Sequence, residues 1–361
     1  MDTPLGLEQG VRIMDMSSPP SSSPANGFVV RVLDGPLSEA IRGSVLAIGN
    51  FDGVHSGHQA VISQALEIAR QQKKPCYVLS FEPHPRAFFQ PDVPVFRLTP
   101  PADKARVLAA FGVDGLLTLP FNADLAATSA EDFIAHFLLE WAGASHVVTG
   151  FNFYFGTKRT GTPQVLAEAG EELGFGVTTV GAFAAQNPET QENEPVSSSR
   201  IREALQNAHT QKAADLLGYR WTVSGIVVKG AQLGRTLGYP TANIKLPEGM
   251  TLAHGIYAVR LRRADGTLHN GVASFGRRPT FDNGAPLLET FVFDFSEDLY
   301  GETITISLFE YLRGEEKFDG AEALVEQMDR DSDAARDVLR TAKPLSVLDD
   351  RLNFARLLDG G

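Results

Sequence analysis

His55 and His58 lie three residues apart, at the predicted start of a helix, in the glycine-rich run GNFDGVHSGH. Side chains at that spacing share one face of a helix, so both imidazoles can point into a single pocket. The helix N-terminus presents unpaired N–H groups to phosphate oxygens, and Gly49, Gly53 and Gly57 let the backbone approach a ligand closely. These groups fit nucleotidyl transfer, in which they hold a triphosphate and stabilise charge while pyrophosphate leaves the α-phosphorus.

Two other interpretations of this run are a pair of unrelated surface histidines beside a helix cap and a zinc site. A zinc site needs further ligands at suitable spacing, and the sequence offers none around these histidines. A short apolar strand, residues 44–48, precedes the run, and a helix, residues 59–74, follows it. That order favours the phosphate interpretation, because ligands of parallel sheets bind beyond the carboxyl ends of the strands.

A second glycine-rich loop lies far along the chain, in KGAQLGRTLGYPTAN. Gly230, Gly234 and Gly238 permit a backbone cradle for phosphates. Thr241 and Asn243 lie two residues apart, so an extended segment places their oxygens on one face, where they suit Mg²⁺ bound to ATP phosphates. The spacing matches neither a Walker loop nor a Rossmann fingerprint. A tight β-turn with structural glycines is the alternative.

A kinase that phosphorylates a hydroxyl needs a general base. Glu289 is the lone carboxylate at the predicted start of a strand, ETFVF, whose other residues are apolar or β-branched. It is therefore our candidate for accepting the hydroxyl proton, and a solvated residue at a strand end is the alternative.

Three further segments carry groups suited to the first pocket. GFNFYFGTKRTG follows a predicted strand and combines aromatic rings with basic groups. SSSRIR begins a predicted helix, where hydroxyls and guanidinium groups could close on phosphates. FEPHPR leaves another strand as a proline-stiffened loop that could clamp a substrate. The respective alternatives are core packing with a solvated turn, a simple helix cap, and rigid loop packing.

The pattern of apolar residues divides the chain into two kinds of structure. Strands at 44–48, 76–81, 116–119 and 146–149 alternate with helices at 59–74 and 131–141, which predicts a parallel sheet. A helix over 200–217 follows a polar stretch without assigned elements. Short strands at 221–228, 255–261, 271–275, 289–295 and 303–308 then predict a compact antiparallel barrel, and the pattern over 321–358 predicts helix. We expect a disordered tail at 1–27 and domains at 28–212 and 213–361.

Composition limits the class of protein. The 361 residues are enough for two domains with separate cores. The net charge of −12 is opposite to the basic surface that general nucleic-acid binding needs, and no apolar run reaches membrane-spanning length, so we expect neither nucleic acid nor a membrane as a partner. No secretory signal is visible, and the single cysteine, Cys76, fits a reducing cytoplasm. A homo-oligomer is compatible with the sequence.

In these residues and motifs, the chain resembles the prokaryotic bifunctional riboflavin kinase/FMN adenylyltransferase family, over about residues 28–340. The matching segments, in the family's order, are GNFDGVHSGHQ, FEPHP, GFNFYFG, SSSRIR, GRTLGYPTAN, GRRPTF, ETFVFDF and LYG. The resemblance implies an α/β nucleotidyltransferase-type parallel-sheet domain followed by a β-barrel riboflavin kinase domain with a C-terminal helix. It also implies riboflavin, FMN, FAD and ATP as substrates and products, with Mg²⁺ as cofactor.

The resemblance assigns roles to individual residues. His55, His58 and Glu289 are the expected catalytic residues, and Glu289 acts on the terminal hydroxyl of the ribityl chain. The expected adenylyltransferase contacts to ATP are Gly49, Phe51, His55, His58, Asn152, Ser198, Ser199 and Arg202, and those to flavin are Phe81, His84 and Pro85. The expected kinase contacts to ATP are Gly230, Gly234, Gly238, Thr241 and Asn243, and the metal ligands are Thr241 and Asn243.

The chain departs from the family at four positions. Ser274 stands where the family often has Asn, Gly314 where Pro is common, Asn152 where Asp is frequent, and Ser199 where Thr is frequent. The last two keep a hydrogen-bonding group. Competing functions are another nucleotidyltransferase with an accessory barrel, or a flavin or nucleotide sensor without turnover. The intact PTAN loop and Glu289 argue against the first, and retention of both phosphate sites argues against the second.

Overall fold

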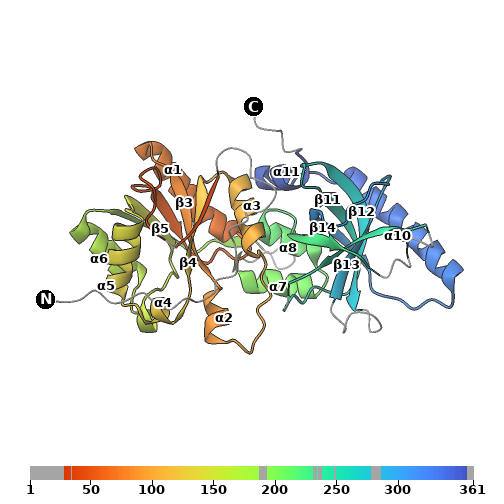
Figure 1. Ribbon diagram of the computed structural model, residues 1–361, viewed down its shortest axis with the longest axis horizontal. Coiled ribbons are helices and arrows are strands. Elements are labelled where there is room, and N and C mark those ends of the chain that lie inside the picture. The colour runs from red at the N-terminus through yellow and green to blue at the C-terminus, as the bar shows by residue number, and fades with distance from the viewer. Residues whose placement is uncertain are drawn as a thin grey trace.

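The computed structural model describes residues 28–33, 35–186, 193–230, 234, 238–247, 249–277 and 286–355. The predicted tail at 1–27 lies outside this part of the chain. An α/β layer structure at one end of the molecule and a barrel at the other are joined by two helices, α7 (Ser198–Gln206) and α8 (Thr210–Leu217), as Figure 1 shows. Among the described residues, no helix is long and apolar enough to cross a membrane.

The N-terminal half is built on a six-stranded, all-parallel sheet with strand order β1-β4-β3-β2-β5-β6. The strands are β1 (Val29–Val32), β2 (Val45–Ile48), β3 (Cys76–Glu82), β4 (Gly115–Pro120), β5 (His146–Gly150) and β6 (Gly176–Val180). The direction of winding reverses at β2 and β5, which is where parallel sheets open a ligand crevice beyond the strand ends. The predicted parallel sheet is confirmed, and β6 is an additional edge strand that the half-buried, threonine-containing run did not predict.

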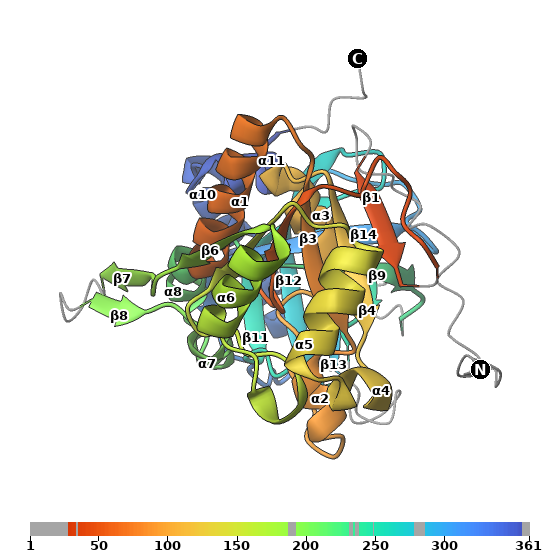
Figure 2. The same ribbon diagram turned by 90° about the vertical axis from the view of Figure 1, so that its left-hand side faces the viewer.

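Helices cover both faces of this sheet. On one face α1 (Ser56–Gln72) and α3 (Pro101–Phe111) pack with β2 to β5 around a buried apolar cluster. On the other face lie α6 (Pro163–Leu173) and the helix that starts as α5 (Ala130–Asp132) and continues as the π-helical segment η1 (Phe133–Trp141). Figure 2 views this half end-on. The shorter elements are α2 (Pro85–Phe89), α4 (Ala123–Ala127), η2 (Thr157–Arg159), β7 (Ala184–Gln186) and β8 (Asn193–Pro195).

The helical connection between the two halves differs from the prediction. One helix was expected over 200–217, but α7 ends at Gln206 and α8 begins at Thr210. The backbone turns between them, with Ala208 at a φ of 62° and the His209 N–H donating to the Ala204 carbonyl at 2.8 Å. The proposed domain boundary at residues 212 and 213 falls inside α8.

The C-terminal half is a closed antiparallel barrel of strand order β10-β13-β12-β11-β14-β9, which confirms the barrel prediction. The strands are β9 (Thr222–Val228), β10 (Thr241–Lys245), β11 (Gly255–Arg262), β12 (Leu268–Arg277), β13 (Pro286–Val292) and β14 (Thr303–Arg313). The predicted C-terminal helix is two helices, α10 (Ala321–Thr341) and α11 (Val347–Asn353). Pro344 lies between them, and a residue before proline is driven out of the helical region.

The two halves share one buried apolar cluster. It includes Leu98 and Leu108 from the sheet half and Trp221 and Val223 from the start of the barrel. Buried hydrogen bonds reinforce it, because the Trp221 indole N–H donates to the Leu98 carbonyl at 2.9 Å. On α3, Asp103 accepts from the Ser224 hydroxyl at 2.6 Å. Figure 1 places α3 and α11 where the halves meet. These contacts therefore fix the barrel near the carboxyl ends of the parallel strands.

Candidate active sites

The two histidines of the first site lie together where β2 passes into α1. His55 is the N-cap of α1, and its Nδ1 accepts the His58 backbone N–H at 3.3 Å. The two imidazole rings stack with centroids 3.6 Å apart and an interplanar angle of 13°. A Cβ at position 57 would lie 3.3 Å from the His55 ring, so glycine there leaves room for the stack. The predicted convergence of both side chains is thus seen in the structure.

Both histidines are held in the neutral form at neutral pH. Burial lowers the pKa of His55 to about 4, against a smaller opposing effect of its own backbone hydrogen bond. Burial, the adjacent His55 and Lys104 lower the pKa of His58 well below its usual value. In the described part of the chain, His58 Nδ1 is buried without a hydrogen-bond partner. A neutral imidazole has one donor and one acceptor, so this pair can serve phosphate oxygens as directed hydrogen-bond donors rather than as charges.

The other predicted segments converge on the same edge of the sheet. The FEPHP loop follows β3, and Asn152 follows β5, so both lie beyond carboxyl ends of strands that flank β2. His84 caps α2 by accepting the Arg86 N–H at 3.1 Å, and burial lowers its pKa to about 4. Asn152 is exposed, and Pro85 is half-buried at the first position of α2. The order of strands in the sheet, β3-β2-β5, therefore places these two loops on either side of the histidine loop.

The rings of Phe51 and Phe81 take part in packing. Phe51 is 1% exposed, has a φ of 47°, and sets its ring edge-on to His58 with centroids 5.2 Å apart. It therefore supports the imidazole from behind. Phe81 is buried against Phe121 and Phe133. Its expected flavin contact is limited by that burial, whereas Phe89, at the end of α2, is 65% exposed and was not singled out in the sequence.

The SSSRIR segment is tied to the histidine loop by internal contacts. Ser198 Oγ donates to the Asp52 carbonyl at 2.8 Å. Arg202 forms an ion pair with the Asp52 carboxylate and donates to the Phe96 carbonyl at 2.5 Å. Ser199 is exposed at the first turn of α7. In this structure Ser198 and Arg202 hold the loop, and Ser199 is the member whose side chain faces solvent.

Packing within the chain already requires glycine at position 53, whatever its contact with a ligand. It has a φ of 91°, and a Cβ there would lie 2.8 Å from Leu98 Cδ1. Its N–H donates to Thr99 Oγ1 at 2.8 Å, and its carbonyl accepts the Tyr219 hydroxyl at 2.7 Å. Tyr219 and Thr99 were not found by sequence reasoning, because their role depends on contacts between distant segments.

The second site is organised by the register of three barrel strands. Asn243 on β10 is the direct partner of Glu289 on β13, and Glu289 is the direct partner of Ser274 on β12. Directly opposed residues of antiparallel strands project to the same face, and Thr241 shares that face with Asn243. Glu289 lies inside β13, which starts at Pro286, and not at a strand start as the sequence indicated. The variant position Ser274 is therefore a neighbour of the candidate base.

Asn243 has the features of a ligand-binding side chain. It is 4% exposed, its Nδ2 donates to the Thr241 carbonyl at 3.3 Å, and its Oδ1 is buried with no partner among the described residues. A Cβ at position 230 would fall 2.6 Å from Asn243 Nδ2, so Gly230 allows the backbone to pass close to this amide. Gly234 similarly packs against the Tyr239 carbonyl, and Gly238 has a φ of 86°. The glycines at 230 and 234 are thus explained by close approach within the chain.

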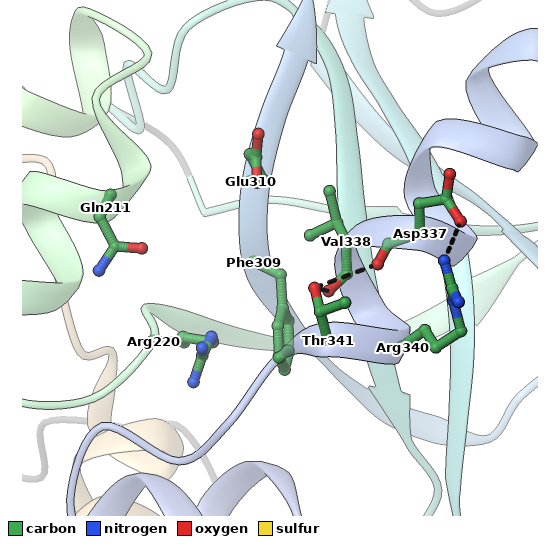
Figure 3. Close-up of a pocket in the computed structure, with 9 residues that line it drawn as sticks. Gln211, Arg220, Phe309, Glu310, Asp337, Val338, Arg340 and Thr341 are labelled. Atoms are coloured by element: carbon green, nitrogen blue, oxygen red, sulfur yellow. Dashed lines mark hydrogen bonds and ion pairs between the residues drawn. The ribbon is translucent and has the colours of Figure 1, made fainter.

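A separate cavity of about 490 Å³ lies between α8, β14 and α10 (Figure 3). Its walls include Gln211, Arg220, Phe309 and Glu310. None of the predicted site residues lines it. It is therefore distinct from both candidate sites.

Comparisons with known proteins agree with this two-site arrangement. The family model for FAD synthetase matches residues 37–200, and that for riboflavin kinase matches residues 217–339. A nucleotidyltransferase-type sheet followed by a riboflavin kinase barrel defines a two-domain class of flavin-nucleotide enzymes. The chain belongs to the family of bifunctional riboflavin kinase/FMN adenylyltransferases, as its similarity to named relatives shows.

Those relatives match most of the chain. The bifunctional riboflavin kinase/FMN adenylyltransferase of Escherichia coli K12 is 37% identical over 85% of this chain and 97% of its own length. The protein of the same name from Listeria monocytogenes is 38% identical over 81% of this chain and 91% of its own. The crystal structure of a macrolide-efflux protein from Streptococcus pneumoniae matches with a TM-score of 0.71 and 31% identity, over 84% of this chain and 95% of that one. Macrolide efflux is said of the Streptococcus protein alone, and the likeness shows a shared fold.

Proposed function

We propose that the barrel site phosphorylates riboflavin to FMN and that the histidine site transfers the adenylyl group of ATP to FMN, giving FAD and pyrophosphate. Membership of the family supports both activities. The observation that carries the assignment of sites is the presence, in one chain, of a stacked neutral histidine pair at a helix start and a register-aligned Asn243 and Glu289 in the barrel. The proposed domains are residues 28–212 and 213–361.

At the histidine site, the chain supplies hydrogen bonds to a nucleotide. An oxygen of the FMN phosphate attacks the α-phosphorus of ATP, and the bond to the bridging oxygen breaks to release pyrophosphate. His55 and His58 donate to the triphosphate at the N-terminus of α1, where backbone N–H groups add to the attraction. Asn152, exposed Ser199 and the backbone of Gly49 complete the contacts, with His84 and Pro85 on the flavin side. Ser198, Arg202 and Phe51 act by fixing the loop.

At the barrel site, Glu289 accepts the proton of the terminal ribityl hydroxyl. The hydroxyl oxygen attacks the γ-phosphorus of ATP, and ADP leaves. Magnesium fits the oxygens of Thr241 and Asn243, because Asn243 Oδ1 is buried and lacks a partner within the described structure. No three acidic, histidine or cysteine side chains of the described residues form a metal-binding group, so phosphate oxygens would supply the remaining ligands. When bound, the cation neutralises phosphate charge.

Further expectations concern partners and location. Mg²⁺ and ATP serve the kinase site, and the chain uses riboflavin, FMN and FAD without nucleic acid or a membrane as partner. A homo-oligomer and a cytoplasmic location remain part of the proposal. The single cysteine, Cys76, supports this location. It is buried in β3, and burial raises the pKa of its thiol to about 12, so the thiol is unsuited to disulfide exchange.

The test is to incubate the protein with riboflavin and Mg-ATP and to separate the flavins by chromatography. Wild type should form FMN and then FAD. His58→Ala should sharply reduce FAD formation while FMN accumulates, and the matched variant His136→Ala, at an exposed helical histidine, should behave as wild type. Formation of a product other than FMN and FAD would favour a different nucleotidyltransferase, and binding without turnover would favour a sensor.

A further inference from the structure

A buried lysine lies directly behind the histidine loop. Lys104 on α3 is 2% exposed. Its Nζ donates to the Asn50 carbonyl at 2.7 Å and to Ser80 Oγ at 2.9 Å. Ser80 belongs to β3, and Asn50 begins the turn that leads to the histidines. One ammonium group therefore joins α3, β3 and the loop of the adenylyltransferase site.

The charge of this ammonium is not neutralised by the carboxylates around it. Asp52 pairs with Arg202, and Glu82 pairs with Arg97 through two hydrogen bonds of 2.9 Å. Lys104 has three N–H donors, and its two acceptors in the described structure are neutral oxygens. A buried ammonium without a counter-ion is costly. An anion arriving at the loop would compensate that cost, and the triphosphate of ATP is the anion that the proposed reaction brings there.

We propose that Lys104 is a positioning residue of the adenylyltransferase site, where its charged ammonium holds the Asn50 turn in place for the histidine pair and favours a bound triphosphate. This inference rests on the function proposed for His55 and His58. It explains why the pocket can bind phosphates although its histidines are neutral. Two other cations near the loop are paired with carboxylates: Arg202 with Asp52, and Arg97 with Glu82 at 2.9 Å and with Asp52 at 3.9 Å.

The protonation of Lys104 gives the proposal a measurable signature. Burial, followed by the nearby Arg97, lowers the pKa of Lys104 to about 8, while Glu82 and Asp52 act in the opposite direction. The ammonium is thus charged at neutral pH and loses its proton near pH 8. Adenylylation should decline as the pH rises through that value, and phosphorylation of riboflavin by the same chain should not share this decline.

The experiment compares three variants of the full-length protein across pH 6–10. Lys104→Met removes charge and donors, Lys104→Gln keeps a short donor without charge, and Lys104→Arg keeps a charge that does not titrate in this range. Arg106→Met is the matched control, because Arg106 lies on the same helix but binds Thr222 of the barrel. Riboflavin phosphorylation and the thermal midpoint report whether each protein is folded.

We expect Lys104→Met to lower kcat/KM for FAD formation from FMN roughly 10- to 150-fold, the range for a lost charged hydrogen bond. Lys104→Gln should recover little, and Lys104→Arg should restore activity and lose the decline near pH 8. Arg106→Met should adenylylate normally. Wild-type adenylylation in folded Lys104→Met would overturn the proposal. If that variant does not fold, an unchanged alkaline decline in Lys104→Arg would overturn it equally.

Failure of this inference can be told apart from failure of the site assignment. If His58→Ala retains adenylylation, the site itself is wrongly assigned. If His58→Ala loses adenylylation while all three Lys104 variants match wild type at every pH, only the role of Lys104 is wrong.

Discussion

Tyr219→Phe isolates one hydrogen bond that joins the start of the barrel to the histidine loop. Tyr219 is 1% exposed, and its hydroxyl donates to the Gly53 carbonyl at 2.7 Å. The substitution keeps the buried ring and leaves the Gly53 carbonyl without its donor. An unsatisfied buried acceptor costs about 1–3 kcal/mol. Because Gly53 lies two residues before His55, the loop should leave its active shape to relieve that cost.

If the full free-energy cost displaces the loop from its active conformation, kcat/KM for FAD formation from FMN should fall roughly 5- to 150-fold. Riboflavin phosphorylation should stay near the wild-type rate, because Thr241, Asn243 and Glu289 come from barrel strands. The assay measures both reactions separately, with FMN or riboflavin as the starting flavin and matched ATP concentrations.

Tyr257→Phe is the matched control. Tyr257 is also fully buried, and its hydroxyl also donates to a carbonyl, that of Ala253, but both groups belong to the barrel. It should lower the thermal midpoint without a selective loss of adenylylation. Equal adenylylation by Tyr219→Phe and wild type, together with a lowered midpoint, would refute the reasoning, since the bond would then stabilise the fold without shaping the loop.

Three further predictions concern the kinase site. Glu289→Gln keeps the shape but cannot accept the hydroxyl proton, so FMN formation should fall roughly 10²–10⁴-fold while FAD formation from supplied FMN persists. The control is Glu310→Gln, at an exposed strand position. Normal phosphorylation by Glu289→Gln would mean that another group is the base. Asn243→Ala should weaken the use of Mg-ATP at the kinase site, so that phosphorylation at fixed free Mg²⁺ needs more ATP to saturate, and an unchanged ATP dependence would contradict the ligand assignment. A fragment of residues 213–361 should fold cooperatively and phosphorylate riboflavin without making FAD; a folded but inactive fragment would show that the kinase site needs the N-terminal half.

The sequence predicted those parts of the fold that local pattern determines. The apolar runs of β2, β3 and β5 are fully or largely buried strands, and their order placed the histidine loop, the FEPHP loop and Asn152 at one edge. Pattern failed where burial was partial or the chain was glycine-rich. The edge strand β6 is half-buried and contains threonines, and β10 directly follows the glycine-rich segment at 230–238.

Contacts between distant segments account for the rest of what the sequence did not predict. Lys104 meets Asn50 across 54 residues, and Tyr219 meets Gly53 across 166. No local sequence spacing predicts either contact, because each depends on how α3 and the start of the barrel pack against the sheet. The packing of Gly53 against Leu98 was likewise not predicted, because it joins segments 45 residues apart.

The two sites depend on the shared core to different degrees. The histidine loop is braced from across the proposed domain boundary: Gln59 donates to the Leu217 carbonyl at 2.6 Å, Ser56 Oγ donates to the Leu216 carbonyl at 3.0 Å, and the Tyr219 hydroxyl donates to the Gly53 carbonyl. These partners all lie after residue 212. The kinase residues are positioned by strand register within the barrel. A chain cut at the proposed boundary keeps the framework of the kinase site and removes the supports of the histidine loop, so we expect the two activities to be separable in one direction only.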